Sequence, residues 1–218
     1  MKVDFHVHTD FSIDGLIKVG ELARKSKELG VIPVISDHNT LEGVKEFRKT
    51  GAPFIPGEEI RTESGDLTGI FLSEKIEKKL SFPETVDKIK EQGGLAYLPH
   101  MYDMSRHGCG DEFAGLVDII EVFNARCLNS KLNERALETA EKLGKPGAAG
   151  SDSHFLLEFG KTYTELPEFD IENPKELMKA LGRKRIIGKK IPFYLRGPPY
   201  IVMHFRKIKK KLMGKDIK

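Results

Sequence analysis

Apolar residues recur along the chain with two different periods, and the changes of period predict where strands and helices lie. Residues 2–8 (KVDFHVH) alternate between polar and apolar side chains, which is the period of a β-strand. From Leu16 to Leu29 the apolar residues recur at helical spacing, and Gly30 follows as a residue that favours the end of a helix. The chain is therefore expected to begin with a strand and a helix.

The same alternation continues over most of the sequence. Further strands are predicted at 31–36, 53–56, 95–99, 117–123 and 146–150, and a hairpin is predicted over 59–72. Further helices are predicted at 40–49, 81–92, 131–143 and 173–181. Strands that alternate with helices predict βα repeats built on a parallel sheet.

Polar residues gather where the predicted strands end. Such clusters follow six strands: His6 and His8, Asp37 and His38, Glu58 and Glu59, His100, Glu121, and Asp152 and His154. An open sheet would concentrate these residues at one switch point, whereas a barrel displays them around its mouth. We therefore expect an α/β barrel whose functional site lies at the C-terminal ends of its strands.

Composition excludes several classes of protein. The chain has 218 residues, of which 39% are hydrophobic, so it is long and apolar enough to fold around a core. No apolar run approaches the ~18–20 residues of a membrane span, and no signal peptide is visible. The two cysteines, Cys109 and Cys127, suit a reducing compartment. We expect a globular protein of the cytoplasm.

Charge divides the chain into two parts. The first 180 residues hold 23 basic and 32 acidic residues, whereas the remainder holds 13 basic residues and one acid. We predict a barrel domain over 1–185 and a basic extension over 186–218. Apolar residues between Ile201 and Leu212 have the spacing of a basic amphipathic helix. This helix would pack its apolar stripe on the domain, or it would bind nucleic acid or acidic lipid.

The residues at the strand ends have the chemistry of metal ligands. His6 and His8 are two residues apart on one strand, so both imidazoles face the same side and can bind one transition metal. The alternative is a pair of partly exposed histidines. Glu59 could bridge two cations or be a solvated charge. Glu121 lies within an apolar strand, where a carboxylate needs a cation or an arginine as its partner.

Together these clusters predict a binuclear or trinuclear metal site. Five of the seven histidines and at least four carboxylates follow predicted strands. Imidazole and carboxylate ligands without a thiolate suit Zn²⁺, Mn²⁺ or Fe²⁺. The other two histidines, His107 in a loop and His204 in the extension, are not expected to be ligands.

Six motifs occur in order along the chain: DFHVHTDFSIDG (4–15), ISDHNT (35–40), GEE (57–59), PH (99–100), EVFN (121–124) and GSDSH (150–154). This series resembles the motifs of the PHP (polymerase and histidinol phosphatase) superfamily from residue 3 to about 165. The resemblance implies a distorted (β/α)₇ barrel with a metal cluster at the strand C-termini. It also implies hydrolysis of phosphoesters, such as histidinol phosphate, nucleotides or short nucleic-acid ends.

The resemblance further implies a ligand set for each metal. The first metal would be held by His6, His8, Glu59 and Asp152; the second by the bridging Glu59, His100 and Glu121; and the third by Asp14, His38 and His154. Members of the superfamily often carry a histidine at the position of Asp14. A third site with altered occupancy or metal identity is therefore implied here, and Glu58 is expected to be a bystander.

The implied mechanism is attack on phosphorus by a hydroxide held between two of these two or three divalent cations. Arg126 is the arginine expected to bind the phosphate, with Arg106 as an alternative, and a structural salt bridge is the other interpretation of Arg126. Asp37 or His154 would protonate the leaving group. The expected substrate is a phosphorylated small molecule or a nucleotide.

Three other functions remain open from the sequence. The same centre could hydrolyse nucleic-acid ends that dock on the basic extension. Metal-dependent amidohydrolases also open a barrel with two histidines spaced in this way, and they would hydrolyse amides or lactones. The chain could also be a non-catalytic barrel subunit of an RNA-processing particle.

Overall fold

The protein is described by a computed structural model over residues 1–195 and at residues 204, 206 and 208. Within these residues the centre of the molecule is one sheet with the strand order β7-β6-β5-β4-β3-β2-β1-β8-β9. The strands are β1 (Lys2–Val7), β2 (Val31–Ile35), β3 (Ile55–Arg61), β4 (Asp66–Ile70), β5 (Leu95–Leu98), β6 (Ile119–Asn124), β7 (Gly147–Gly150), β8 (Tyr163–Glu165) and β9 (Arg185–Ile187). The helices are α1 (Val19–Leu29), α2 (Glu42–Arg48), α3 (Phe82–Glu91), α4 (Ser130–Lys142) and α5 (Pro174–Leu181).

The sheet curves until β7 meets β1. The backbone that follows β7 pairs with β1, because the Asp152 amide donates to the His6 carbonyl at 2.8 Å and the His8 amide donates to the Ser153 carbonyl at 3.0 Å. All neighbouring pairs from β1 to β7 are parallel except those of β4, which is antiparallel to β3 and β5. The predicted distorted seven-stranded barrel is confirmed, and the predicted β3–β4 hairpin is its main distortion.

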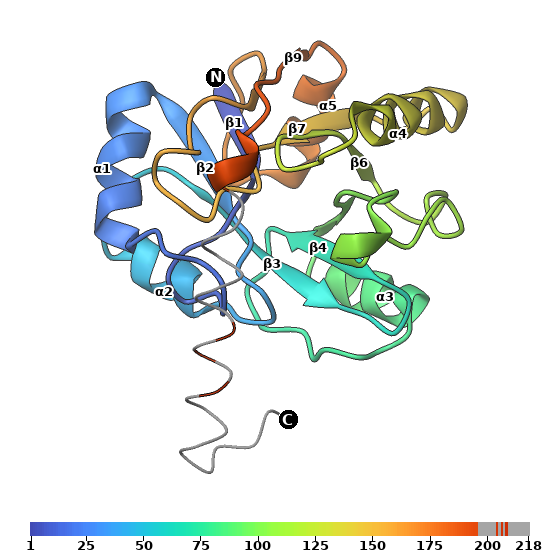
Figure 1. The fold of residues 1–218 in the computed structure, drawn as a ribbon, viewed down its shortest axis with the longest axis horizontal. Helices are drawn as coiled ribbons and strands as arrows, with labels where there is room; N and C mark the ends of the chain where they lie inside the picture. Colours follow the sequence, from blue (N-terminus) through green and yellow to red (C-terminus); the bar gives the residue numbers. More distant parts are fainter. Residues whose placement is uncertain (196–203, 205, 207, 209–218) are drawn as a thin grey trace.

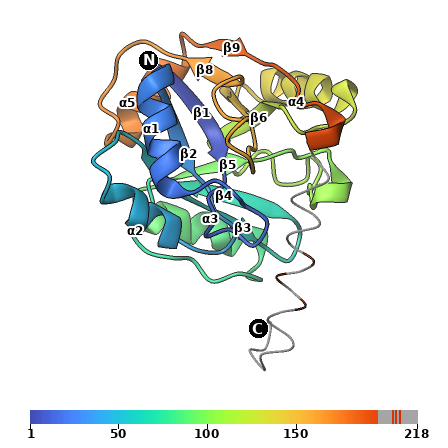
Figure 2. The same ribbon diagram turned by 60° about the vertical axis from the view of Figure 1, so that its left-hand side comes forward.

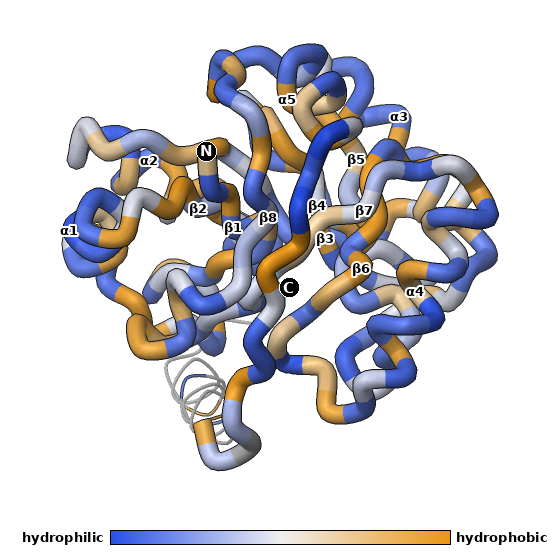
Figure 3. The backbone as a smooth tube through the Cα atoms, turned by 90° about the horizontal axis from the view of Figure 1, so that it is seen from above, coloured by the Kyte–Doolittle hydropathy of each residue, from blue (hydrophilic) through white to orange (hydrophobic). Residues whose placement is uncertain are grey.

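The helices lie outside the barrel. Figures 1 and 2 show α1 beside β2, α3 beside β4 and β5, and α4 beside β6. Hydrophobic colour runs through the central strands in Figure 3, and hydrophilic colour covers much of the outer turns of α1 and α4. This division is the amphipathic pattern from which the sequence predicted the helices.

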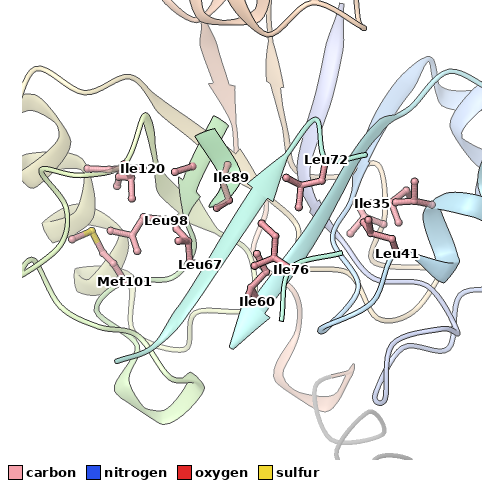
Figure 4. Packing of buried hydrophobic residues seen from close by; sticks show 14 of the residues in the cluster. Ile35, Leu41, Ile60, Leu67, Leu72, Ile76, Ile89, Leu98, Met101 and Ile120 are labelled. Atoms are coloured by element: carbon pink, nitrogen blue, oxygen red, sulfur yellow. The ribbon is translucent and has the colours of Figure 1, made fainter. Parts of the chain in front are cut away.

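Buried apolar side chains form two clusters, one on each side of the sheet. The first joins the strands to α1, α2, α3 and α4, so it lies between the sheet and these helices. Figure 4 shows part of it, with Ile60 and Leu67 of the hairpin between the neighbours Leu98 and Ile35. The second cluster joins strands that are not neighbours: the Phe5 ring stacks on the Tyr97 ring at 5.8 Å. This cluster therefore fills the barrel interior below the site.

Local signals fix several helix ends as the sequence predicted. The Ser81 side chain accepts from the Glu84 amide at the start of α3, and the Asn173 side chain caps α5 in the same way. Gly30 ends α1 with a φ of 62°, a conformation that glycine adopts without strain. The start of α1 differs from the prediction, because the Leu16 amide donates to the His154 carbonyl instead of extending the helix.

Two short strands after β7 were not predicted. β8 runs antiparallel to β1, and β9 pairs with β8, so the sheet continues beyond the point of closure. Each has only three residues, which is too short for alternation to give a signal. β9 also spans the boundary that the charge pattern placed between residues 185 and 186.

Most of the predicted amphipathic helix in the extension lies outside the described residues. Residues 204, 206 and 208 are described, and all three are helical. The Arg206 guanidinium donates to the carbonyl oxygens of Ser12, Ile13 and Gly15, so it contacts the loop that follows β1. Among the described residues, no helix has the length and apolar content needed to cross a bilayer.

Candidate metal centre

Eight of the nine predicted metal ligands converge at one end of the barrel. They fall into overlapping groups in which one ligand atom from each residue lies within 4.8 Å of the others. These groups are His8, Asp14, His38 and His154; His6, His100 and Asp152; His6, His8 and Glu59; and Glu59, Asp66 and His100. Glu121, the ninth predicted ligand, is not a member of these groups.

The two histidines of β1 are oriented by different partners. His6 Nδ1 lies 3.2 Å from Glu121 Oε1, so this nitrogen donates its proton to the carboxylate and the ring directs Nε2 toward the centre. His8 Nδ1 lies 3.3 Å from Ser12 Oγ. The two Nε2 atoms face each other at 3.0 Å. Burial, together with the neighbouring His154, lowers the pKa of His8 to about 3, so this imidazole is the neutral form that binds metals.

The donor set fits divalent cations. His6 Nε2 and His8 Nε2 each lie 3.4 Å from Glu59 Oε2 and within 3.7 Å of Asp152 Oδ1. Glu59 Oε2 is buried and has no hydrogen-bond partner among the described residues, although His38 Nδ1 is 3.0 Å away. Burial would lower the pKa of His6, but Asp152 and Glu59 raise it well above its ordinary value, so this buried surrounding favours a positive charge beside His6 and His8. A divalent cation at this place would supply that charge and would also satisfy the unpartnered oxygen of Glu59.

Glu59 lies at the junction of the groups. Its Oε1 is 3.0 Å from His100 Nε2, while Oε2 faces the histidines of β1 and His38. Burial would raise the pKa of Glu59, but His38 and His6 hold it well below its ordinary value. An ionised carboxylate with its two oxygens facing different imidazole groups is arranged to bridge two cations.

The third group surrounds Asp14. Its Oδ2 lies 3.4 Å from His38 Nε2 and 3.2 Å from His154 Nε2. The His154 ring is fixed by a 2.8 Å contact between Nδ1 and the Asp152 carbonyl. Burial would lower the pKa of His38, but Asp14 and Glu59 raise it to about 10. This electronegative surrounding suits a positive charge, carried by a proton or by a metal ion.

Glu121 lies behind His6, and hydrogen bonds occupy both of its oxygens. Oε1 accepts from the Tyr97 hydroxyl at 2.9 Å and faces His6 Nδ1. Oε2 accepts from the His100 amide at 2.7 Å and from Asn124 Nδ2 at 2.8 Å. The sequence indicated that this buried carboxylate needs partners, and the structure supplies them from protein groups.

The two candidate arginines occupy different places. Arg106 lies at the centre, where Nη1 donates to Asp152 Oδ2 and Nη2 donates to Asn124 Oδ1 at 3.0 Å. Arg126 Nη1 forms a buried ion pair with Glu158 Oε1 at 2.8 Å. The second oxygen of Glu158 accepts from the His154 amide at 2.7 Å, so this pair holds the loop that carries His154.

Two other predicted residues point away from the groups. Asp37 accepts 2.6 Å hydrogen bonds from the amide and the hydroxyl of Thr9, and burial raises its pKa to about 6. Glu58 Oε2 accepts from the Ile76 amide at 3.0 Å, and burial raises its pKa to about 7. Asp37 therefore supports the loop after β1, and Glu58 lies on the other side of its strand from Glu59.

A cavity of about 430 Å³ opens above these residues. Six of the candidate ligands line it, namely Asp14, His38, Glu59, His100, Asp152 and His154. The basic residues that line it are Arg61, Lys78, Lys79, Arg106 and Arg126. An anionic ligand in this cavity would meet both the candidate cations and the basic side chains.

Sequence reasoning missed two residues of this centre. Asn124 Nδ2 donates to both Glu121 and Asp152. No role was predicted for Asn124, although it belongs to the EVFN motif. Asp66, on β4, lies near Glu59 and His100 but follows a hairpin turn instead of a strand end. Its place at the start of a reversed strand brings it to the mouth, and the hairpin predicted over 59–72 contained the signal for this position.

Gly150 is a position where close packing holds the centre together. A Cβ atom there would lie 2.2 Å from Glu121 Oε1 and 2.5 Å from the Cβ of His6. We expect Gly150→Ala to lower the free energy of unfolding by about 1–3 kcal/mol and to reduce metal content, because His6 must move. Gly20→Ala is the control, since its Cβ would meet nothing within 4 Å. Equal metal content in both variants, measured by mass spectrometry, would contradict the assignment of His6.

A barrel whose strand ends carry converging imidazoles and carboxylates is the architecture of metal-dependent hydrolases. The protein belongs to the PHP family: the model of the PHP domain matches residues 4–57, and a model described as PHP-associated matches residues 131–186. The family expected from the sequence motifs is thereby confirmed, and with it the coarse class of metal-dependent hydrolase.

Two relatives come from Methanocaldococcus jannaschii. Uncharacterized protein MJ0417 is 40% identical over 185 residues, which cover 81% of this chain and 75% of that protein. Uncharacterized protein MJ1587 is 37% identical over 158 residues, which cover 65% of this chain and 92% of that protein.

Three solved structures share the fold. A proposed metal-dependent phosphoesterase of Bifidobacterium adolescentis aligns with a TM-score of 0.58 at 16% identity, over 88% of this chain and 97% of that chain. PsfC of Pseudomonas syringae aligns at 0.63 and 14%, over 95% and 98%. An amidohydrolase of Chromobacterium violaceum, solved with sulfate and without metal, aligns at 0.60 and 15%, over 85% and 98%. At these identities the likeness establishes the fold alone.

Proposed function

We propose that the protein is a metal-dependent phosphoesterase that hydrolyses a phosphomonoester or a nucleotide at a centre of two or three divalent transition metal ions. One observation carries this proposal. The cavity that is lined by candidate metal-binding residues is also lined by five lysine and arginine side chains. A dianionic phosphate needs such an environment, whereas a neutral amide or lactone does not.

The proposed ligands divide into three sites. The first comprises His6, His8, Glu59 and Asp152, and Glu59 also reaches toward His100 of the second. The third comprises Asp14, His38 and His154. The four carboxylates of the ligand groups, Asp14, Glu59, Asp66 and Asp152, carry four negative charges, so three divalent ions with neutral imidazoles would leave a net positive charge for an anionic substrate.

Bound divalent cations would supply an activated water and would neutralise charge on the phosphoryl oxygens. The protein groups around them position the reactants. Glu121 accepts the Nδ1 proton of His6 and thereby turns Nε2 toward the centre. Arg106 is held by Asp103 and Asn124 and donates to Asp152, and its guanidinium would contact a phosphate oxygen bound beside Asp152.

The leaving group requires a proton donor near the mouth. His154 Nε2 lies on the cavity wall, 3.2 Å from Asp14 Oδ2. Asp37 does not line the cavity and is bonded to Thr9. Of the two proton donors suggested by the sequence, His154 is therefore the one that we propose for a centre in which only the first two cation sites are filled.

A panel of substrates tests this proposal. We expect Mn²⁺-dependent hydrolysis of phosphomonoesters or nucleotides and loss of turnover after chelation. Hydrolysis of amides or lactones without any phosphoester turnover would contradict the proposal and favour the amidohydrolase class. A purified protein that binds no transition metal would point to a non-catalytic role.

Nucleic-acid ends are the second candidate substrate, because the chain beyond Leu181 is strongly basic. A substrate that docks along several phosphates loses affinity steeply as salt rises. Turnover of oligonucleotide ends that falls by about 10³-fold or more between 50 and 200 mM salt would favour this substrate. Turnover of a small ester that is insensitive to salt would favour the first.

The two arginines are expected to respond differently to substitution. Arg106→Ala should raise KM for a phosphomonoester by about 10–100-fold, because one charge-assisted contact to phosphate is lost. Arg126→Ala should instead lower the free energy of unfolding by about 3–5 kcal/mol, because it leaves the buried Glu158 carboxylate without its arginine. Steady-state kinetics and urea unfolding measure these effects. A raised KM in Arg126→Ala and a loss of stability in Arg106→Ala would instead assign phosphate binding to Arg126.

A further inference from the structure

We propose that Asp66, on the reversed strand β4, is a ligand of the second cation together with Glu59 and His100. This inference rests on the proposed multinuclear centre and names a ligand that the sequence motifs do not include. One ligand atom from each of the three residues lies within 4.8 Å of the other two. Asp66 is 3% exposed, so its carboxylate is directed into the molecule and not into solvent.

Glu121 is poorly placed for this role. Its two oxygens already face four partners, namely His6 Nδ1, the Tyr97 hydroxyl, the His100 amide and Asn124 Nδ2. Binding a cation would require the loss of at least one of these buried hydrogen bonds, which costs about 1–3 kcal/mol. The second site therefore needs a carboxylate from elsewhere.

The pairing of β3 with β4 places Asp66 where that carboxylate is needed. Arg61 lies opposite Asp66 in the hairpin, two residues beyond Glu59. The Asp66 backbone is held from the other side, because its amide donates to the His107 carbonyl at 2.9 Å. Asp66 is thus fixed at the mouth of the barrel. Its strand, β4, lies between β3, which carries Glu59, and β5, which leads to His100.

Asp66 and Glu59 are two buried acids in one group of candidate ligands, so a positive charge beside them is stabilising. Glu59 Oε2 is buried without a hydrogen-bond partner among the described residues. That oxygen faces the histidines of β1 and His38, whereas a second cation held by Glu59 Oε1, Asp66 and His100 would offset the charge of both carboxylates.

Arg61 supports this arrangement as a positioning residue. Its Nε and Nη2 donate to the two oxygens of Asp66, and an ionised carboxylate offers about four acceptor directions. Lone pairs therefore remain on Asp66 for a metal while Arg61 fixes the orientation of the carboxylate. The competing interpretation is an ion pair that only stabilises the hairpin.

Titration of the metal-free full-length protein with Mn²⁺ distinguishes these interpretations. We expect the wild type to bind at least two ions with an exchange-coupled electron paramagnetic resonance signal. Asp66→Asn should weaken one of these ions by at least ten-fold and remove the coupled signal. Arg61→Gln, which keeps the carboxylate, should retain both ions with a smaller loss of affinity.

Two further variants serve as controls. Glu58→Gln removes a buried carboxylate of the same hairpin, one that accepts from the Ile76 amide and not from the centre, and this variant should bind Mn²⁺ as the wild type does. The double variant Arg61→Met/Asp66→Ala removes the ion pair without leaving one charge unpaired, and it should show the same loss as Asp66→Asn. Circular dichroism checks that each variant is folded.

Three results would overturn the inference. They are wild-type binding of fewer than two Mn²⁺ ions, Asp66→Asn binding both ions as the wild type does, and equal losses in Asp66→Asn and Arg61→Gln. Failure of the proposed function is distinguishable from these. A wild type that binds two coupled ions but hydrolyses no phosphoester would contradict the proposed activity. The assignment of Asp66 as a ligand would then still be decided by the Mn²⁺ titration of the variants.

Discussion

Replacing His8 by alanine is expected to abolish turnover while the protein stays folded. His8 is fully buried, and its Nε2 faces His6, Glu59 and Asp152. Loss of a residue that merely supports a metal ligand costs about 10–100-fold in affinity or activity, so loss of a ligand should cost at least ~100-fold. We expect metal content to fall by one ion per chain or more. Mass spectrometry of the metals and a phosphomonoester assay measure both effects.

The control for this experiment is His204→Ala, since His204 is exposed and lies outside the centre. It should keep the metal content and the activity of the wild type. Circular dichroism should show the same fold in both variants, because strand β1 is held by backbone pairing with β2 and β8. If His8→Ala retained full metal content and turnover, the assigned centre would be wrong.

Removal of the metals is expected to lower the melting temperature strongly. A ligand present at 1,000 times its Kd stabilises the folded state by about 4 kcal/mol. For a chain of this size each kcal/mol shifts the melting temperature by roughly 2–4 °C, so each tightly held ion should contribute about 8–16 °C. The physical reason is that Glu59, Asp152 and Asp14 each belong to a group of convergent ligand atoms, whose negative charge a cation would offset.

Calorimetry before and after dialysis against a chelator measures this shift. Added Mn²⁺ should restore the original transition, and His8→Ala should show a smaller change because it has less metal to lose. An unchanged transition in the wild type would mean that the acids and imidazoles are stabilised by one another, without cations.

The sequence predicted the barrel because its signals are local. Period-two alternation over residues 2–8 and apolar runs such as 31–36 survive in the structure as β1 and β2. The three-residue strands β8 and β9 carry no such pattern and were missed. Their place is decided by pairing with β1, whose residues are far away in the sequence.

The convergence of the candidate ligands also followed from local signals. Residues such as His100 and Asp152 come directly after strands, and parallel strands of a barrel end at the same mouth. What could not be predicted was the direction of each side chain. Both arginines were placed near the mouth, but Glu158 determines that Arg126 is paired, and Asp152 and Asn124 determine that Arg106 lies at the centre.

The central claim is that distant imidazoles and carboxylates hold several cations in one pocket. Anomalous diffraction from crystals grown with Mn²⁺ tests it most directly. We expect at least two strong peaks, one within bonding distance of His6, His8, Glu59 and Asp152 and one beside Glu59 and His100. Crystals with Mn²⁺ present and no anomalous peak among these residues would contradict the account.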